Sequence, residues 1–185
     1  RGSERDGVEY YFVTAERFQE KIKQQAFIEW QEVYAGNYYG TYASEIERLS
    51  AMGKNIVYEG AAGAGQKTKA ANQIAIAGAL AGACEAFAYA KTMGLDVEKV
   101  FASISGGAAA SFQMSHMVRM ALDGNFAPGF MLKHFIKDMR IGAETGIGCG
   151  LRLPVLMQVL TEARDLEEKG LGTEGTQTLL KYYEK

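Results

Sequence analysis

The sequence has few of the residues that build disulfide and metal sites. Its 185 residues include two cysteines, Cys84 and Cys149, and two histidines, His116 and His134. The cysteines form no CxxC pair, and neither histidine has a cysteine or glutamate at metal-ligand spacing. This pattern excludes a disulfide framework and a recognisable metal site. It predicts reduced thiols and a cytoplasmic location.

Long hydrophobic runs and a strong net charge are also missing. No apolar run approaches about 18 residues without a polar break, and the first residues have no signal-peptide pattern. The formal net charge is −2, so the composition is globular and has no nucleic-acid signature. We therefore expect neither nucleic acid nor a membrane among the partners of this chain.

The chain changes character near residue 59, which predicts two parts. More than half of the aromatic residues lie in residues 1–59, which we expect to form a small and incomplete α+β segment. The expected strands are Val8–Val13, Phe27–Val33 and Asn55–Tyr58, and the expected helices are Thr14–Gln25 and Ser44–Met52, with a turn at 35–37.

The sequence of residues 60–185 predicts an all-α domain of six helices. The fold as a whole is therefore expected to be mainly α. Asp96 and Pro154 have the chemistry of helix starts, and Gly94 and Gly170 that of helix stops. The expected helices are a long first one, Gln66–Met93, followed by Val97–Ile104, Ser111–Leu122, Met131–Thr145, Pro154–Lys169 and Glu174–Tyr183.

A glycine-rich loop leads into the long helix. Its glycines at 60, 63 and 65 give G-x-x-G-x-G, which reverses the dinucleotide fingerprint, and Lys67 is one residue out of register for a phosphate loop. Lys69 and Asn72 share one helical face. We expect Lys69 in the first helical turn, where an ammonium group is electrostatically costly, and therefore a candidate for proton transfer beside an amide that orients a substrate oxygen. The alternative is a solvated lysine.

Several motifs after the loop resemble the β-hydroxyacid dehydrogenases, the family of 3-hydroxyisobutyrate dehydrogenase and tartronate semialdehyde reductase. The resemblance covers about residues 49–185, and one stretch, Glu174–Gln177, departs from it. The motifs are Gly63-x-Gly65-x-x-x-Lys69-x-x-Asn72-Gln73, Ser105-Gly106-Gly107 with Ser111, Asn125–Phe130, His134–Asp138, Gly170–Thr173 and Tyr182–Lys185.

The resemblance implies roles for six residues. Lys69 would be the catalytic acid or base, Asn72 would help hold the substrate, and Gly106 and Gly107 would lie near the substrate pocket. Lys137 would reach an NAD or NADP cofactor, with Asp138 orienting that lysine or its helix. The implied substrate is a small 3-hydroxy acid or semialdehyde, and the implied assembly is a homo-oligomer.

The first part resembles a different family, the GMP-binding region of guanylate kinase. The motifs are Arg1 to Phe12, Phe27-Ile28-Glu29-Trp30 and Asn37-Tyr38-Tyr39-Gly40-Thr41. By this resemblance Arg1, Tyr10 and Tyr39 would contact the GMP phosphate, Glu29 would read the guanine, and Thr41 would contact the base. A tyrosine-rich hairpin on its own is more typical of a packed β surface.

Neither part is complete: one lacks the kinase phosphate loop and lid, and the other lacks a dinucleotide-binding Rossmann domain. We interpret the chain as a chimera, formed by fusion or by a sequence-assembly join near residues 47–57, and expect little or no dehydrogenase turnover. The alternatives are a GMP-binding fragment without kinase activity and a structural helical module that self-associates. Sequencing single DNA molecules across codons 45–60 tests the join.

Overall fold

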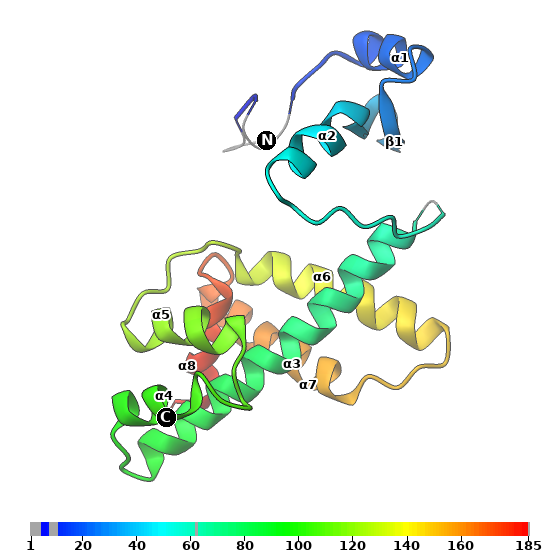
Figure 1. The fold of residues 1–185 in the computed structure, drawn as a ribbon. Coiled ribbons are helices and arrows are strands. Elements are labelled where there is room, and N and C mark those ends of the chain that lie inside the picture. The colour runs from blue at the N-terminus through cyan, green and yellow to red at the C-terminus, as the bar shows by residue number, and fades with distance from the viewer. Residues whose placement is uncertain (1–4, 8–10, 62, 185) are drawn as a thin grey trace. The chain divides into compact units, whose positions relative to one another are not determined.

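The computed structural model describes residues 5–7, 11–61 and 63–184 (Figure 1). The chain divides into two compact units, Arg1–Ala62 and Gly63–Lys185. The division falls three residues after the one predicted from composition. Each unit has its own packing and is treated separately below.

The first unit is a β hairpin between two helices. Its elements are α1 (Ala15–Lys23), β1 (Phe27–Tyr34), β2 (Asn37–Tyr42) and α2 (Ala43–Ala51). Thr14 caps α1, because its hydroxyl oxygen accepts a hydrogen bond from the Arg17 backbone N–H at 3.3 Å. The strands pair antiparallel, with Gln31 opposite Tyr39. The predicted helices and the strand from Phe27 are confirmed.

A column of aromatic rings holds this unit together. The Phe18 ring, on α1, stacks on Phe27 at 4.3 Å and on Tyr38 at 5.4 Å between centroids, and Phe27 stacks on Tyr42 at 4.8 Å. Phe18 is only 6% exposed, and it is the one buried hydrophobic residue among those described before residue 63. The core of the first unit is therefore very small.

Two predicted strands of the first unit are wrong or only partly described. Asn55–Tyr58 is exposed and has no strand partner, because the described residues before it offer only the β1–β2 hairpin. Tyr11–Val13 is not a strand either, and residues 8–10 lie outside the described residues. β2 was missing from the predicted element order, although the tyrosine-rich pattern indicated a hairpin.

The regular elements of the second unit are helices, as predicted, and its described residues add one isolated β bridge between Met131 and Gly175. Six segments correspond to the six expected helices, three of them built from two consecutive pieces. The elements are α3 (Ala64–Thr92), α4 (Val97–Ile104), the π-helix η1 (Gln113–Val118) with α5 (Arg119–Leu122), α6 (Leu132–Gly148), α7 (Pro154–Leu166), a short π-helical turn η2 (Glu167–Leu171), and the 3₁₀ turn η3 (Thr176–Leu179) with α8 (Leu180–Tyr183).

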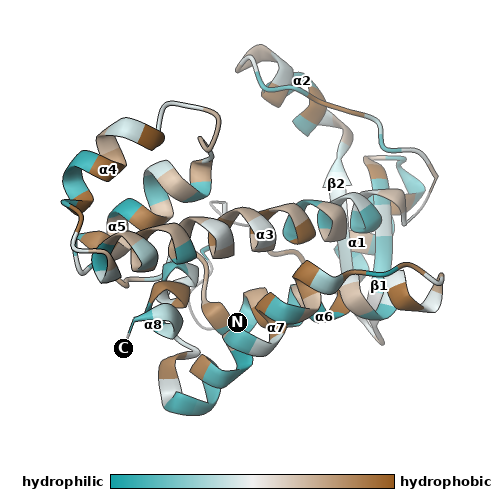
Figure 2. Ribbon diagram, turned by 90° about the horizontal axis from the view of Figure 1, so that it is seen from below, coloured by the Kyte–Doolittle hydropathy of each residue, from teal (hydrophilic) through white to brown (hydrophobic). Residues whose placement is uncertain are grey.

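The long helix α3 is the centre of this unit, and α6, α7, α8 and η1 all pack against it (Figure 1). Small side chains such as Ala77 and Ala81 let the neighbours approach, while Leu80 and Phe87 are fully buried. White and brown residues accordingly run along α3 in Figure 2. By length and composition alone α3 could also cross a membrane, a test that a buried core helix passes as well.

The helix ends follow the sequence signals in most places. The Asp96 carboxylate accepts hydrogen bonds from the N–H groups of Glu98 and Lys99, and Pro154 is the first residue of α7. α7 ends at Leu166 and continues directly into the π-helical residues from Glu167, and Gly170, at φ +85°, interrupts the helical geometry where the sequence predicts a stop. The last helical segment begins at Thr176 and not at the expected Glu174.

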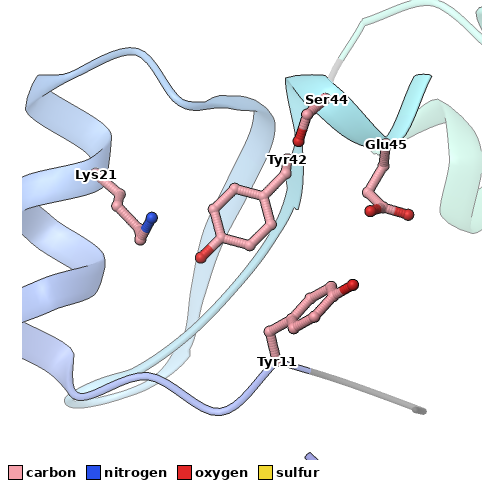
Figure 3. Close-up of a pocket in the computed structure, with 5 residues that line it drawn as sticks. All are labelled: Tyr11, Lys21, Tyr42, Ser44 and Glu45. Atoms are coloured by element: carbon pink, nitrogen blue, oxygen red, sulfur yellow. The ribbon is translucent and has the colours of Figure 1, made fainter. Parts of the chain in front are cut away.

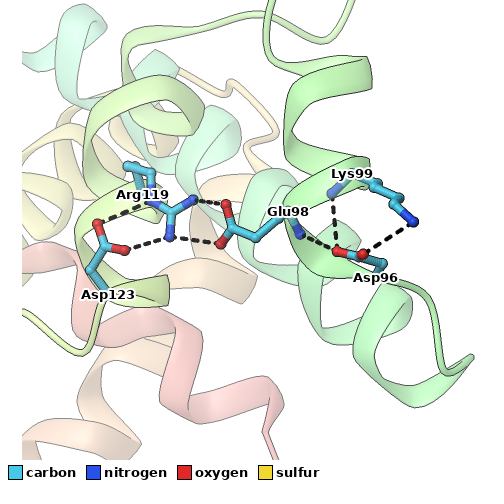
Figure 4. A network of polar contacts seen from close by, with 5 residues as sticks. All are labelled: Asp96, Glu98, Lys99, Arg119 and Asp123. Carbon is cyan, nitrogen blue, oxygen red and sulfur yellow. Dashed lines mark hydrogen bonds and ion pairs between the residues drawn. The ribbon is translucent and has the colours of Figure 1, made fainter.

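A guanidinium group ties α4 to α5 (Figure 4). The Arg119 side chain donates two hydrogen bonds to Glu98, at 2.8 and 3.0 Å, and two to Asp123, at 3.1 and 2.5 Å. It also lies over the Phe101 ring, 5.1 Å from its centroid. Hydrogen bonds to both carboxylates raise the pKa of Arg119, so its charge is permanent.

We expect Arg119→Gln to lower the free energy of unfolding by about 1 kcal/mol, because both bidentate pairs are lost at a site that remains partly solvated. The matched control is Lys99→Gln, which removes a lysine that is 84% exposed and whose ion pair with Asp96 is 3.5 Å long. Urea denaturation at low and high salt measures both. If Arg119→Gln lowers the free energy of unfolding by no more than Lys99→Gln does, the expectation is wrong.

A buried carboxylate anchors the C-terminal helix α8. Glu162, on α7, is 4% exposed and accepts hydrogen bonds from the Tyr183 hydroxyl at 2.5 Å and from Gln158 Nε2 at 3.0 Å. Burial and this hydrogen bond raise the pKa of Tyr183 far above its ordinary value. A raised pKa in the folded state contributes stability that is complete below about pH 10 and is lost as the pH rises beyond it.

We therefore expect Tyr183→Phe to cost about 2 kcal/mol of unfolding free energy at pH 8, since the buried carboxylate loses its hydroxyl donor. The difference from the unchanged protein should shrink as the pH rises above about 10. Tyr182→Phe is the matched control, and it should show no such narrowing. Chemical denaturation across this pH range measures both variants. A stability difference between Tyr183→Phe and the unchanged protein that does not vary with pH would contradict the raised pKa of Tyr183.

Candidate functional site

The crossing of α3 and α6 brings four polar residues together. Gly142 of α6 lies against α3, since a Cβ added there would be 3.4 Å from the Ile74 side chain. Within one and a half turns of this contact, α3 contributes Lys69 and Gln73 and α6 contributes Lys137 and Asp138. We call these four residues the Asp138 cluster.

Asp138 is the centre of the cluster. Its side chain is 6% exposed, whereas those of Lys69 and Lys137 are 57% and 53% exposed. Asp138 Oδ1 lies 2.9 Å from the Lys137 ammonium, and Oδ2 lies 3.5 Å from the Lys69 ammonium. Oδ2 also accepts a hydrogen bond from Gln73 Nε2 at 3.1 Å. One buried carboxylate therefore holds two lysines that remain open to solvent.

The charge state of Asp138 follows from these contacts. Burial by itself raises the pKa of the carboxyl group, and it is the largest single influence. The hydrogen bonds from Lys137 and Gln73 and the charges of both lysines outweigh it, so the pKa of Asp138 falls below its ordinary value. Asp138 is therefore ionised at neutral pH and supplies a fixed negative charge.

The structure corrects the reason for which Lys69 was singled out. α3 begins at Ala64, five residues before Lys69, so Lys69 lies in the second helical turn and not in the first. The field of a helix terminus fades within one turn. The feature that distinguishes Lys69 from a solvated lysine is its ion pair with a buried aspartate from another helix.

Gln73 is the member of the cluster that the sequence analysis missed. It is 7% exposed and donates to Asp138, whereas its neighbour Asn72 lies on the exposed side of α3. The spacing of Gln73 from Lys69 is i,i+4, which also places two side chains on one helical face. The i,i+4 spacing from Lys69 was therefore a signal for Gln73, as the i,i+3 spacing was for Asn72.

The other predicted substrate residues lie outside the cluster. Asn72 has an exposed side chain, and Gly106 and Gly107 lie in the exposed turn that follows α4. α4 itself packs against α3 near Phe87, whose ring centroid is 5.9 Å from that of Phe101. The roles of Asn72, Gly106 and Gly107 as substrate contacts therefore stay predictions.

The residues present fit only part of a nicotinamide dinucleotide site. The exposed ammonium of Lys137 has the chemistry to contact a phosphate or amide oxygen of such a cofactor. The parallel, doubly wound sheet that binds the rest of a dinucleotide is not found among the described residues, whose one sheet is the antiparallel hairpin. The same described part of the chain has no group of three or more His, Cys, Asp or Glu residues that could hold a metal.

In the first unit, two of the predicted GMP contacts lie together. Glu29 and Thr41 face each other across β1 and β2, and the Thr41 hydroxyl donates to Glu29 Oε1 at 3.2 Å. Tyr39 lies two residues from Thr41 on the same strand, so its side chain is on the same face. Arg1 and Tyr10 lie outside the described residues.

A separate open pocket of about 330 Å³ lies elsewhere in this unit (Figure 3). It is lined by Tyr11, Lys21, Tyr42, Ser44 and Glu45, none of which is a predicted GMP contact. The Lys21 ammonium already lies 4.8 Å from the Tyr42 ring centroid, and Glu45 is paired with Arg48 at 2.6 Å. The pocket's charged groups are thus engaged within the unit.

Comparison with protein families separates the same two parts. Residues 63–183 match the model of the NAD-binding domain of NADP-dependent 3-hydroxyisobutyrate dehydrogenase, and residues 1–78 match that of guanylate kinase. An uncharacterised oxidoreductase of Bacillus subtilis is 46% identical over 74% of this chain and 48% of its own length. A guanylate kinase of Porphyromonas gingivalis is 44% identical over 32% of this chain and 31% of its own length.

The solved structures agree with the fold of the second unit. A 3-hydroxyisobutyrate dehydrogenase of Salmonella typhimurium superposes with a TM-score of 0.69 at 23% identity, over 75% of this chain and 50% of that one. The chain thus spans about half the length of its oxidoreductase relatives. Since the family model covers most of the chain, this protein belongs, through residues 63–183, to the NAD-binding family of the 3-hydroxyisobutyrate dehydrogenases, joined to a segment similar to guanylate kinase.

Proposed function

We propose that the second unit is the acid/base half of an NAD(P)-dependent enzyme that interconverts a small 3-hydroxy acid and its semialdehyde. The observation that carries this proposal is the Asp138 cluster, in which a buried carboxylate holds the exposed Lys69 ammonium at 3.5 Å. The family membership supports the same reaction class. The specific hydroxy acid, of the tartronate semialdehyde or 3-hydroxyisobutyrate type, is part of the proposal.

The chemistry assigned to this chain is proton transfer. In reduction, the Lys69 ammonium donates a proton to the carbonyl oxygen of the substrate as that oxygen gains negative charge, and in oxidation the neutral amine removes the hydroxyl proton. When bound, a nicotinamide cofactor would supply or accept the hydride. Asp138 is a positioning residue, because it fixes Lys69 from one oxygen and Lys137 from the other. Asn72, Gly106 and Gly107 are proposed substrate contacts.

We propose further that the isolated chain turns over little or no substrate, since its described residues supply only part of a dinucleotide site. The test is a hybrid in which residues 63–185 replace the matching half of the Bacillus subtilis relative. We expect NAD(P)H-dependent reduction of tartronate semialdehyde or methylmalonate semialdehyde by the hybrid and none by the isolated chain. A well-folded hybrid that reduces neither compound, beside an active parent enzyme, argues against the proposal.

A second candidate function, weak GMP binding by the first unit, is favoured by the cross-strand pair of Glu29 and Thr41. An ionised carboxylate accepts hydrogen bonds from the N–H groups of guanine. Titration of the full chain with GMP should show binding that Glu29→Gln removes, whereas Glu32→Gln, on the same strand, leaves it unchanged. Absence of binding at millimolar GMP would count against this function.

Self-association through the alanine-rich helices of the second unit is a further proposal, as the resemblance implies a homo-oligomer. Large hydrophobic side chains stay exposed on this unit, among them Val155 at 60% and Leu151 at 56%. Sedimentation of the chain over a dilution series tests it, and a monomer at every concentration would argue against it.

A further inference from the structure

Residues 54–59, with the sequence Lys-Asn-Ile-Val-Tyr-Glu, have the composition of a strand but no strand partner. They belong to no helix, strand or turn, and all six are exposed. None of the residues that the structure describes forms a backbone hydrogen bond with residues 55–58. The N–H and C=O groups of this stretch, which we call the 54–59 segment, are therefore available to another chain.

Three large hydrophobic side chains in the 54–59 segment face solvent. Ile56 is 43% exposed, Val57 70% and Tyr58 88%. Tyr58 is the most exposed of the large hydrophobic residues in the described part of the chain. Since β-branched and aromatic residues favour strands, pairing of this segment with another strand would bury these side chains and satisfy its backbone groups together.

The composition of the 54–59 segment indicates which partner it fits. The described residues of the first unit form one sheet, the β1–β2 hairpin, and the segment lies outside it. Its six residues have no net charge and include neither proline nor glycine, which is typical of segments that pair with copies of themselves. The charges that usually protect an unpaired strand are confined to its two ends, at Lys54 and Glu59.

These two end charges favour one orientation of the strands. When two copies of the segment pair antiparallel with all six residues aligned, Lys54 of one copy lies opposite Glu59 of the other. In the same arrangement Ile56 lies opposite Val57, so hydrophobic side chains meet at the centre of the pair. Parallel pairing in register would instead bring like charges together at both ends, which is unfavourable.

We propose that the 54–59 segment binds the same segment of a second copy of this chain as an antiparallel β strand. Each strand of the pair keeps one open edge, so further copies can add and the product is an intermolecular sheet. The surface is separate from the Asp138 cluster and from the exposed hydrophobic residues of the second unit, such as Val155.

The test is a concentration series of the full chain, followed by sedimentation velocity, thioflavin T fluorescence and amide I infrared spectroscopy. We expect assemblies with an intermolecular antiparallel β signal that grows with protein concentration. Val57→Lys places a charge at the centre of the segment and should abolish this signal. Val155→Lys, at an exposed hydrophobic residue of the second unit, is the matched control and should leave the β signal unchanged.

Reversal of the end charges tests the orientation. Lys54→Glu places an acidic residue at both ends of the segment, so an attractive cross-strand pair becomes repulsive. We expect it to raise the concentration needed for assembly by about two- to five-fold. Lys54→Glu combined with Glu59→Lys gives opposite charges again and should restore assembly. Both side chains are exposed, so neither change removes a buried group.

Three results would overturn the inference. The first is a chain without β signal at about 1 mM, a concentration at which even weak association is detected. The second is assembly that Val57→Lys leaves unchanged and Val155→Lys abolishes, which would assign the association to the second unit. The third is assembly that Lys54→Glu leaves unchanged, which would exclude antiparallel pairing. None of these results affects the dehydrogenase assignment, because the hybrid contains residues 63–185 and lacks the 54–59 segment.

Discussion

Lys69→Ala is expected to lower kcat of the hybrid dehydrogenase by about 10²- to 10⁴-fold, the usual contribution of a positioned general acid or base. The ammonium of Lys69 is the exposed proton donor that the buried Asp138 holds at a fixed place between α3 and α6. Its loss leaves the developing charge on the substrate oxygen without a proton. Stopped-flow measurement of NAD(P)H oxidation at saturating substrate gives kcat directly.

Lys67→Ala is the matched control for this prediction. Lys67 lies two residues earlier on α3 and is exposed, and the ion pairs of Asp138 are with Lys69 and Lys137. It should retain kcat within about two-fold, since a distant surface charge acts weakly. Lys69→Arg keeps the charge but cannot release a proton near neutral pH, so it should be almost as slow as Lys69→Ala. Near-normal turnover by Lys69→Arg would show that Lys69 acts as a charge and not as an acid.

Gly175→Ala is expected to lower the free energy of unfolding by about 2 kcal/mol, through hydrogen bonds lost beside it. A Cβ at position 175 would lie 2.2 Å from Gln177 Oε1. Gln177 is fully buried, and its Nε2 donates to the backbone carbonyls of Asn125 and Ala127, both at 3.1 Å. The side chain can yield to the new methyl group only by giving up these two bonds. Urea denaturation followed by circular dichroism measures the cost.

The partner variant Gln177→Ser separates this mechanism from a general effect of alanine. With the shorter side chain the methyl group at 175 has room, so Gly175→Ala should cost markedly less in the Gln177→Ser background than in the unchanged chain. Gln177 Oε1 is itself buried and has no hydrogen-bond partner among the described residues, which makes its loss less costly. Strictly additive costs would contradict the proposed clash.

The same pair lies in Glu174–Gln177, the stretch that departs from the family resemblance. In the structure Gly175, Thr176 and Gln177 are buried, and the segment joins the start of α6 through hydrogen bonds from the Leu132 and Lys133 backbone N–H groups to the carbonyls of Glu174 and Gly172, both at 2.9 Å. In this chain the stretch is therefore part of the packing of the helical unit.

Local sequence signals determined most of the helices and their ends. Thr14, Asp96 and Pro154 act at the positions that their capping chemistry predicts, because capping depends on a few neighbouring backbone groups. The long helix predicted over Gln66–Met93 is α3, Ala64–Thr92. Asn55–Tyr58 failed as a strand, since a strand requires a partner that no local pattern supplies.

The sequence also identified Lys69, Lys137 and the two family resemblances, because the spacing of a motif can be read directly along the chain. It did not show that Asp138 is buried between both lysines, nor that Gln73 rather than Asn72 turns toward it. These facts depend on the crossing of α3 and α6, which joins residues 65 to 69 positions apart. Only the tertiary structure decides which side chain enters such a crossing, because burial and charge pairing between helices are set by packing and not by spacing along one helix.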